Sequence, residues 1–177
     1  MIEKITSWKI IILLGIFIFI VNFYIFPLYQ SQINEIAGYS IRPLDVQFSY
    51  TKIDVDKAFN DMGQNGRKIN LITTGFIDMI YSIIYGCLFF LLLVKLTRSF
   101  SNRKIQLIFF FPMLGVLFDY LENFGILKML NQFPEITQSQ VNINSALTSS
   151  KWIFILITIV LILILIILNL FNRKINQ

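Results

Sequence analysis

The chain has 177 residues, of which 56% are hydrophobic and 15% aromatic, with a mean hydropathy of +0.70 and a formal net charge of +5. Soluble domains use about 45–50% apolar residues, so this composition is too apolar for a single water-soluble domain. The positive charge is not clustered on one face among polar or aromatic side chains, and no nucleic-acid partner is therefore expected.

Four apolar runs predict four membrane-spanning helices. Crossing ~30 Å of hydrocarbon takes ~20 apolar residues at 1.5 Å per residue, and each run meets that length. Lys4 and Lys9 precede the first run as in a secretory signal, but the run is too long for one and no small-residue cleavage site follows. We therefore expect an all-α bundle of four transmembrane helices, a single integral membrane domain over 1–177, with helices at about 10–28, 69–94, 105–126 and 152–170.

The loop that follows the first helix, about 30–68, is expected to be partly structured and extracytoplasmic. Pro27 and Pro43 are expected to interrupt helix continuation. Residues 46–50 alternate apolar and polar side chains, which predicts a short strand.

The second half of this loop predicts a short amphipathic helix. Asp54 is a candidate cap, apolar residues then recur at helical spacing, and Gly63 closes the segment. Asn65 and Gly66 predict a turn. The loop between the third and fourth helices, about 128–150, is polar and shows little pattern.

Basic residues at the ends of the runs predict the orientation. The short loop between the second and third helices carries basic residues and no acid, and both chain ends are basic on the same side if four spans alternate: Lys4, Lys9, Lys95, Arg98, Arg103, Lys104, Arg173 and Lys174. The basic residues of the first loop are spread out and balanced by acids. The positive-inside rule then predicts a multi-pass cell-membrane protein with both termini in the cytoplasm.

Cysteine and histidine usage excludes several kinds of chemistry. Cys87 is the single cysteine and the chain has no histidine. A disulfide framework, a thiol redox pair and imidazole-based catalysis or metal binding are therefore excluded. We expect no metal site and no cofactor, and acid–base chemistry would fall to carboxylates, tyrosines and lysines.

Three acids lie inside the apolar runs, where each carboxylate costs at least ~2.5 kcal/mol. Asp78 and Asp119 fall ~14 Å and ~11 Å below the outer ends of their helices, and Glu122 lies one turn above Asp119. Helical periodicity places further polar residues on the same faces or at the same depth, and basic partners are expected at the outer rim. The candidate ligand-binding residues are Asn22, Arg67, Asp78, Tyr81, Tyr85, Asp119, Glu122, Asn123 and Lys151.

Two interpretations of this polar layer do not involve catalysis. In the first, the acids line a pocket in the outer half of the bundle that binds a lipid headgroup, a cation or a small polar ligand. In the second, they only fix helix register in a structural membrane protein. In either case the expected partners are membrane lipids and, if the chain is an accessory subunit, another membrane protein or a second copy.

The third interpretation is an intramembrane aspartyl hydrolase, with Asp78 and Asp119 sharing a proton and activating water. The layout is similar to that of signal peptidase II, a small four-span enzyme with its aspartates near the outer surface. Its Asn-x-x-Asp type motifs are absent here, however, and so is the Gly-x-Gly-Asp signature of presenilin-like enzymes. No family is assigned on this layout, and the sequence favours binding over catalysis.

Overall fold

The computed structural model describes residues 6–100 and 103–175, and this part of the chain is helical with no strand. Its elements in chain order are α2 (Trp8–Ile20), η1 (Val21–Ile25), α3 (Phe26–Ala37), α4 (Lys52–Asp61), α5 (Gly63–Ile72), η2 (Thr73–Asp78), α6 (Met79–Leu96), η3 (Thr97–Ser99), η4 (Arg103–Phe109), α7 (Phe110–Gln132) and α8 (Gln138–Ile175). The segments η1 and η2 are π-helical, whereas η3 and η4 are 3₁₀-helical.

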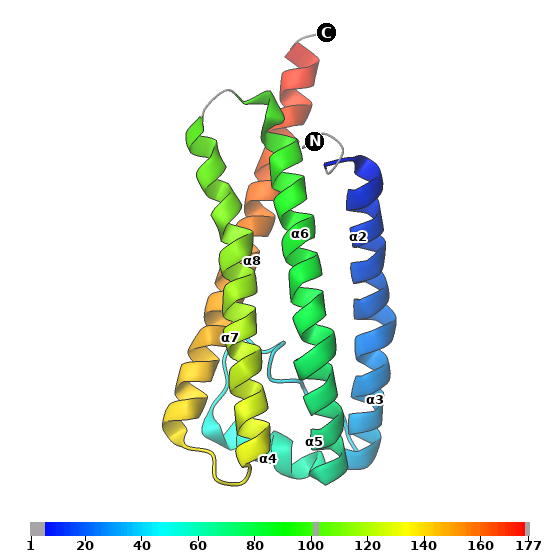
Figure 1. The fold of residues 1–177 in the computed structure, drawn as a ribbon, viewed down its shortest axis with the longest axis vertical. Helices are drawn as coiled ribbons and strands as arrows, with labels where there is room; N and C mark the ends of the chain where they lie inside the picture. The colour runs from blue at the N-terminus through cyan, green and yellow to red at the C-terminus, as the bar shows by residue number, and fades with distance from the viewer. Residues whose placement is uncertain (1–5, 101–102, 176–177) are drawn as a thin grey trace.

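Four continuous helices in the described residues are long and apolar enough to cross a membrane: Trp8–Ala37, Gly63–Leu96, Gln106–Gln132 and Gln138–Phe171. The prediction of an all-helical chain with four potential spans is confirmed. The first residue of α2 and the last residue of α8 lie at the same end of the bundle (Figure 1).

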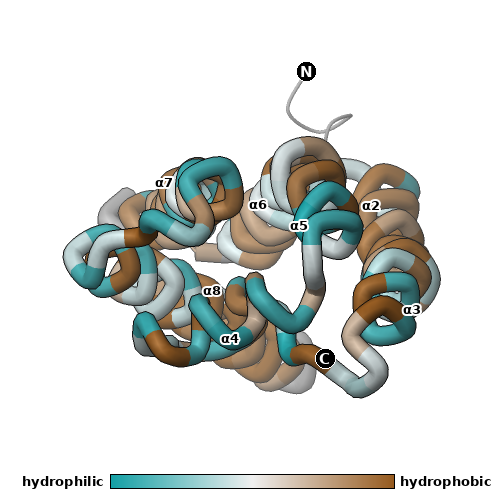
Figure 2. Tube along the Cα trace, turned by 90° about the horizontal axis from the view of Figure 1, so that it is seen from below, coloured by the Kyte–Doolittle hydropathy of each residue, from teal (hydrophilic) through white to brown (hydrophobic). Residues whose placement is uncertain are grey.

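Around the bundle, α2 packs on α6, α6 packs on both α7 and α8, and α7 packs along α8. The helices α2 and α8 do not pack extensively against each other. In the view along the bundle they lie on different sides of α6 (Figure 2). We call the boundary between α2–α3 and α8 the seam.

At the other end of the bundle, opposite the start of α2, the helices extend further than predicted. The first span continues to Ala37, and α7 and α8 are separated only by residues 133–137, so the predicted loop over 128–150 is wrong. The 38 residues of α8 measure ~57 Å at 1.5 Å per residue, well beyond the ~30 Å of a hydrocarbon core. Together α3, α4, α5, the end of α7 and the start of α8 form a unit that we call the cap.

The cap has its own apolar core, which explains why the extra turns are stable. Val55 and Phe59, four residues apart on α4, are both 0% exposed and face this core. Met129 and Val141 reach it from the ends of α7 and α8. The predicted helix in the first loop is therefore present as α4, but its N-cap is Thr51, and Asp54 is the N3 residue of a capping box with Thr51.

Two other predictions for this region are wrong. Residues 46–50 form no strand, because α8 side chains satisfy the backbone: Tyr50 N donates to Ser145 Oγ (2.9 Å), and Ser149 Oγ donates to Phe48 O (2.7 Å). Asn65 and Gly66 lie within α5 rather than in a turn. The chain turns from α4 into α5 two residues before Asn65, at Gly63, whose φ of 59° suits glycine.

Pro27 does not end the first helix. A proline within a helix cannot donate its backbone hydrogen bond and crowds the preceding turn. The π-helical segment η1 ends two residues before it, at Ile25, and Phe26 N donates to Val21 O, one residue further back than in an α-helix. The wider turn accommodates the proline, and the helix continues as α3.

Candidate functional site

A cavity of about 640 Å³ lies between α2–α3 and α8, with α6 forming the wall between them. At the cap end the loop residues Pro43, Asp45 and Val46 line it, together with polar side chains such as Asn22, Thr74 and Asp78. Further from the cap the lining is apolar and consists of Ile18, Leu88, Phe89, Ile155 and Ile159. The cavity is therefore amphipathic along the bundle axis.

Both π-helical segments contribute polar side chains to this cavity. Asn22 lies in η1, and Asp78 is the last residue of η2. A π turn inserts an extra residue and so changes which side chains face the interior, and such turns are frequent at functional sites. Asn22 Nδ2 donates to Tyr81 OH (2.8 Å), which links η1 to α6.

Asp119 on α7 is held through both of its carboxylate oxygens. Ser82 Oγ and Tyr85 OH donate to Oδ2 at 2.7 and 2.9 Å, while Oδ1 lies 3.5 Å from Lys151 Nζ. Asp119 is 3% exposed. This acid therefore joins α6, α7 and α8 in one buried polar contact.

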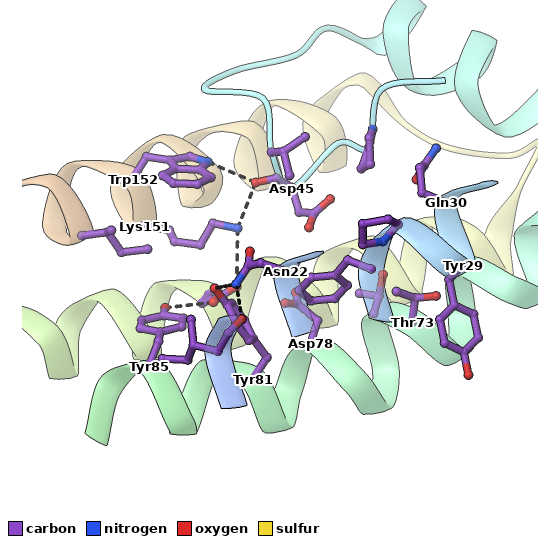
Figure 3. A pocket seen from close by; sticks show the side chains of 18 of the residues that line it. Asn22, Tyr29, Gln30, Asp45, Thr73, Asp78, Tyr81, Tyr85, Lys151 and Trp152 are labelled. Carbon is purple, nitrogen blue, oxygen red and sulfur yellow. Dashed lines mark hydrogen bonds and ion pairs between the residues drawn. The ribbon is translucent and has the colours of Figure 1, made fainter. Parts of the chain in front are cut away.

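Lys151 on α8 is the central cation of the site. Its Nζ lies 2.5 Å from Glu122 Oε2. The same Nζ donates to Asp45 O at 3.1 Å, and Trp152 Nε1 donates to that carbonyl at 3.0 Å (Figure 3). Lys151 is 4% exposed, so it lies inside the site and not at a solvent-facing rim. The lysine thus fixes the loop around Asp45 over the cap end of the cavity.

Glu122 and Asn123 lie behind the cavity wall rather than on its surface, and both are 0% exposed. Thr148 Oγ1 lies 2.9 Å from Glu122 Oε1 and 3.2 Å from Tyr50 OH. Tyr50 OH also accepts from Asn144 Nδ2 (2.7 Å), and burial raises the pKa of this tyrosine to about 12. A buried polar chain therefore runs from Lys151 through Glu122 into the cap.

Asp78 differs from these acids because it forms no ion pair with any residue that the structure describes. Its side chain is 6% exposed and lines the cavity. The Asn123 amide lies beside it without completing a hydrogen bond of regular geometry, and both polar atoms of that amide are themselves unpartnered. A buried carboxylate in this situation needs a proton or an external partner.

The structure adds one acid that sequence reasoning did not select. Asp45 belongs to the loop between α3 and α4, and its carboxylate enters the cavity from the wall opposite Asp78 (Figure 3). Burial raises the pKa of Asp45 above its ordinary value, although the nearby Lys151 ammonium opposes that shift. No sequence signal marks it, since the first loop contains several acids in ordinary polar surroundings.

Most of the predicted site residues come together, and one does not. Asn22, Asp78, Tyr81, Tyr85, Asp119 and Lys151 all line the cavity, with Glu122 and Asn123 directly behind. Arg67 lies in the cap instead, where its guanidinium donates to Phe59 O (2.7 Å) and stacks over the Phe133 ring. The expectation that Arg67 pairs with the buried acids is therefore wrong.

No protein-family model, curated protein sequence or solved structure matches the chain. In the described residues no cluster of three or more Asp, Glu, Cys or His side chains is arranged to hold a metal ion. The hydrogen bonds of Asp119 go to Ser82 and Tyr85, and none joins it to Asp78, so the two acids do not share a proton in this geometry. What the arrangement offers chemically is a set of carboxylates facing an amphipathic cavity.

Proposed function

We propose that this protein is a multi-pass membrane protein that binds a ligand carrying a positively charged group, such as a protonated amine, in the cavity beneath the cap. The single observation that supports this most is Asp78, a buried carboxylate that lines the cavity and has no ion-pair partner within residues 6–100 and 103–175. A bound ammonium would supply the missing hydrogen bonds. Hydrogen bonds to a charged group contribute about 1.5–3 kcal/mol each.

The balance of charge at the site favours a cationic ligand over an anionic one. In the described part of the chain, Asp45, Asp78, Asp119 and Glu122 gather around one ammonium, that of Lys151. Lys151 is already engaged by Asp119 and Glu122, which leaves Asp45 and Asp78 on facing walls. An entering cation would be attracted to both, whereas an anion would be repelled.

We further propose that both termini are cytoplasmic and that the cap lies outside the cell membrane. Lys95 and Arg98 lie at the end of the bundle where the described chain starts and finishes, and both contact Thr6. Basic residues of this kind are enriched on the cytoplasmic side. Lys4, which also supported the prediction, lies outside the described residues.

Membrane lipids are the partners we propose first, because α2 and α8 expose many large apolar side chains. The same surfaces would contact another membrane protein or a second copy if the chain acts as an accessory subunit.

The proposal is tested by identifying what the purified protein carries. The wild-type protein in detergent should release an amine-containing compound on denaturation, detected by mass spectrometry. Asp78→Asn should carry much less of it, because the amide keeps the shape of the side chain but loses its charge. Asp56→Asn is the matched control, since Asp56 lies on α4 and pairs with Lys52 away from the cavity. Equal amounts of the same compound in all three proteins would reject the proposal.

A further inference from the structure

We infer that the ligand is an amphiphile from the membrane itself, an amine headgroup attached to a hydrocarbon chain, which enters sideways through the seam between α2–α3 and α8. This inference rests on the proposed function and adds the class of the ligand and its route of entry. Three observations support it: the apolar depth of the cavity, the open seam, and the covered cap end.

The apolar part of the cavity is longer than a headgroup alone requires. Ile159 lies eight residues beyond Lys151 on α8, which is ~12 Å along the helix, and Leu88 lies ten residues beyond Asp78, ~15 Å along its own helix. Both positions therefore lie further from the cap than the acids do. A soluble amine would leave this apolar length unused, whereas a hydrocarbon chain would fill it.

The volume also fits part of a lipid. Cavities for small ligands usually measure ~300–1,000 Å³. At about 640 Å³, this cavity holds a headgroup with the first part of a chain. The rest of the molecule would stay in the seam among the bilayer lipids.

The seam provides the route because the two helices that border it do not pack tightly together. Ile159 lines the cavity and is still 39% exposed, so one side chain belongs both to the cavity wall and to the apolar outer surface. A hydrocarbon chain could therefore move from the bilayer into the cavity without crossing a polar surface. Its headgroup would meet the carboxylates at the cap end.

At the cap end the loop around Asp45 lies across the cavity. The carbonyl of Asp45 accepts hydrogen bonds from Lys151 Nζ and Trp152 Nε1 at 3.1 and 3.0 Å. Moving this loop aside to admit a water-soluble ligand would require both bonds to break. The sideways route leaves them intact.

The inference is tested with a fatty amine that carries a photoreactive diazirine in its chain, added to the full-length protein in phosphatidylcholine nanodiscs. After illumination, peptide mapping should find the label on residues around Leu88, Ile155 and Ile159. Ile159→Trp should reduce this labelling about tenfold, because the indole occupies the space of the chain. Ile166→Trp is the matched control: it lies on the same helix, is also 39% exposed and does not line the cavity.

A second arm separates the lipid from a soluble amine. Excess ethylamine should not displace the fatty amine, and a fatty alcohol of the same chain length should label the cavity more weakly than the amine.

If ethylamine competes fully and no chain label maps to these residues, the ligand is a soluble amine; the inference is then wrong while the proposed function stands. If Asp78→Asn labels as well as wild type and ethylamine has no effect on any variant, the acids do not bind the amine, and both proposals fail. Circular dichroism and thermal unfolding of each variant show whether it remains folded.

Discussion

Lys151 and Glu122 form an ion pair inside the helical bundle, with Nζ 2.5 Å from Oε2 and side chains that are only 6% and 0% exposed. Such a pair costs desolvation energy on both sides, so it contributes little net stability by itself. Removing one partner is strongly destabilising, because the other charge then stays buried without an opposite charge beside it. The loss of stability when one partner is replaced can therefore be compared with the loss when both are replaced.

We therefore expect Lys151→Met to destabilise the fold by about 3–5 kcal/mol, since it leaves Glu122 and Asp119 without their cation. The double variant Lys151→Met with Glu122→Gln should recover part of this loss. Thermal unfolding in detergent at neutral pH gives the comparison. A single Lys151→Met variant as stable as wild type would mean that the lysine does not hold these helices together.

Asp119→Asn should destabilise the bundle more than Asp78→Asn. Both oxygens of Asp119 face donors, so the amide nitrogen of asparagine must point either at the Ser82 and Tyr85 hydroxyls or at the Lys151 ammonium. Asp78 has no ion pair to lose. The expected cost at Asp119 is about 1–3 kcal/mol, measured by the unfolding midpoint, against little change at Asp78. The opposite order would assign the structural role to Asp78.

The close packing of α6 on α7 depends on Gly86. A Cβ atom at this position would overlap Cγ2 of Val116, whereas a Cβ at Gly15 would meet open space. Gly86→Ala should therefore lower stability by about 1–3 kcal/mol, and Gly15→Ala should not. Combining Gly86→Ala with Val116→Ala should restore part of the loss. Failure of the second change to compensate would show that another contact is responsible.

The capping box of α4 predicts a pH-dependent effect. Hydrogen bonds from the Thr51 backbone N–H and hydroxyl hold the pKa of Asp54 below its ordinary value. A lowered folded-state pKa means that the stabilisation is complete above the unfolded value of about 3.9 and is lost as the pH falls through the folded value.

Thr51→Ala should therefore loosen α4 at neutral pH by about 1 kcal/mol, with a smaller effect in acid. Hydrogen exchange of the α4 amides measures it, with the exposed Asn60→Ala as control. Identical exchange in the Thr51 variant and wild type would contradict the role of the box.

Cysteine labelling in intact cells checks the orientation. In a Cys87→Ser background, Asn65→Cys in the cap should react with an impermeant maleimide, because Asn65 is exposed. Ser99→Cys, between α6 and α7, should react only after the membrane is opened. The reverse pattern would place the cap in the cytoplasm.

The sequence predicted the spans and most of the polar layer because both depend on strong local signals. A carboxylate in a 20-residue apolar run is conspicuous, and helical periodicity placed Asp78, Tyr81 and Tyr85 on one face. These residues do line one cavity. The type and approximate positions of the long helices follow from apolar length alone.

The cap was not predictable in the same way, because contacts between distant segments determine it. Residues 138–150 are polar and look like a loop, yet Val141 is completely buried against the core of the cap and the helix continues through them. Asp45 lies at the site, where Lys151 and Trp152, more than 100 residues away in the sequence, donate to its carbonyl. The position of Arg67 was predicted wrongly for the same reason: its guanidinium stacks on the Phe133 ring in the cap and not beside the buried acids.

The bonds between the first loop and α8 also bear on how the chain is made. Tyr50 is joined to Ser145, and Asp45 to Trp152, across 95 and 107 positions of sequence. In the orientation proposed above, the first loop crosses the membrane before its partners on α8 have been synthesised, and until then its backbone polar groups are hydrogen-bonded to water. Contacts at such separation slow folding, because a long stretch of chain must close before they form. The cavity, whose cap end is covered in part by that loop, is therefore completed only after α8 has been synthesised and has packed against the loop.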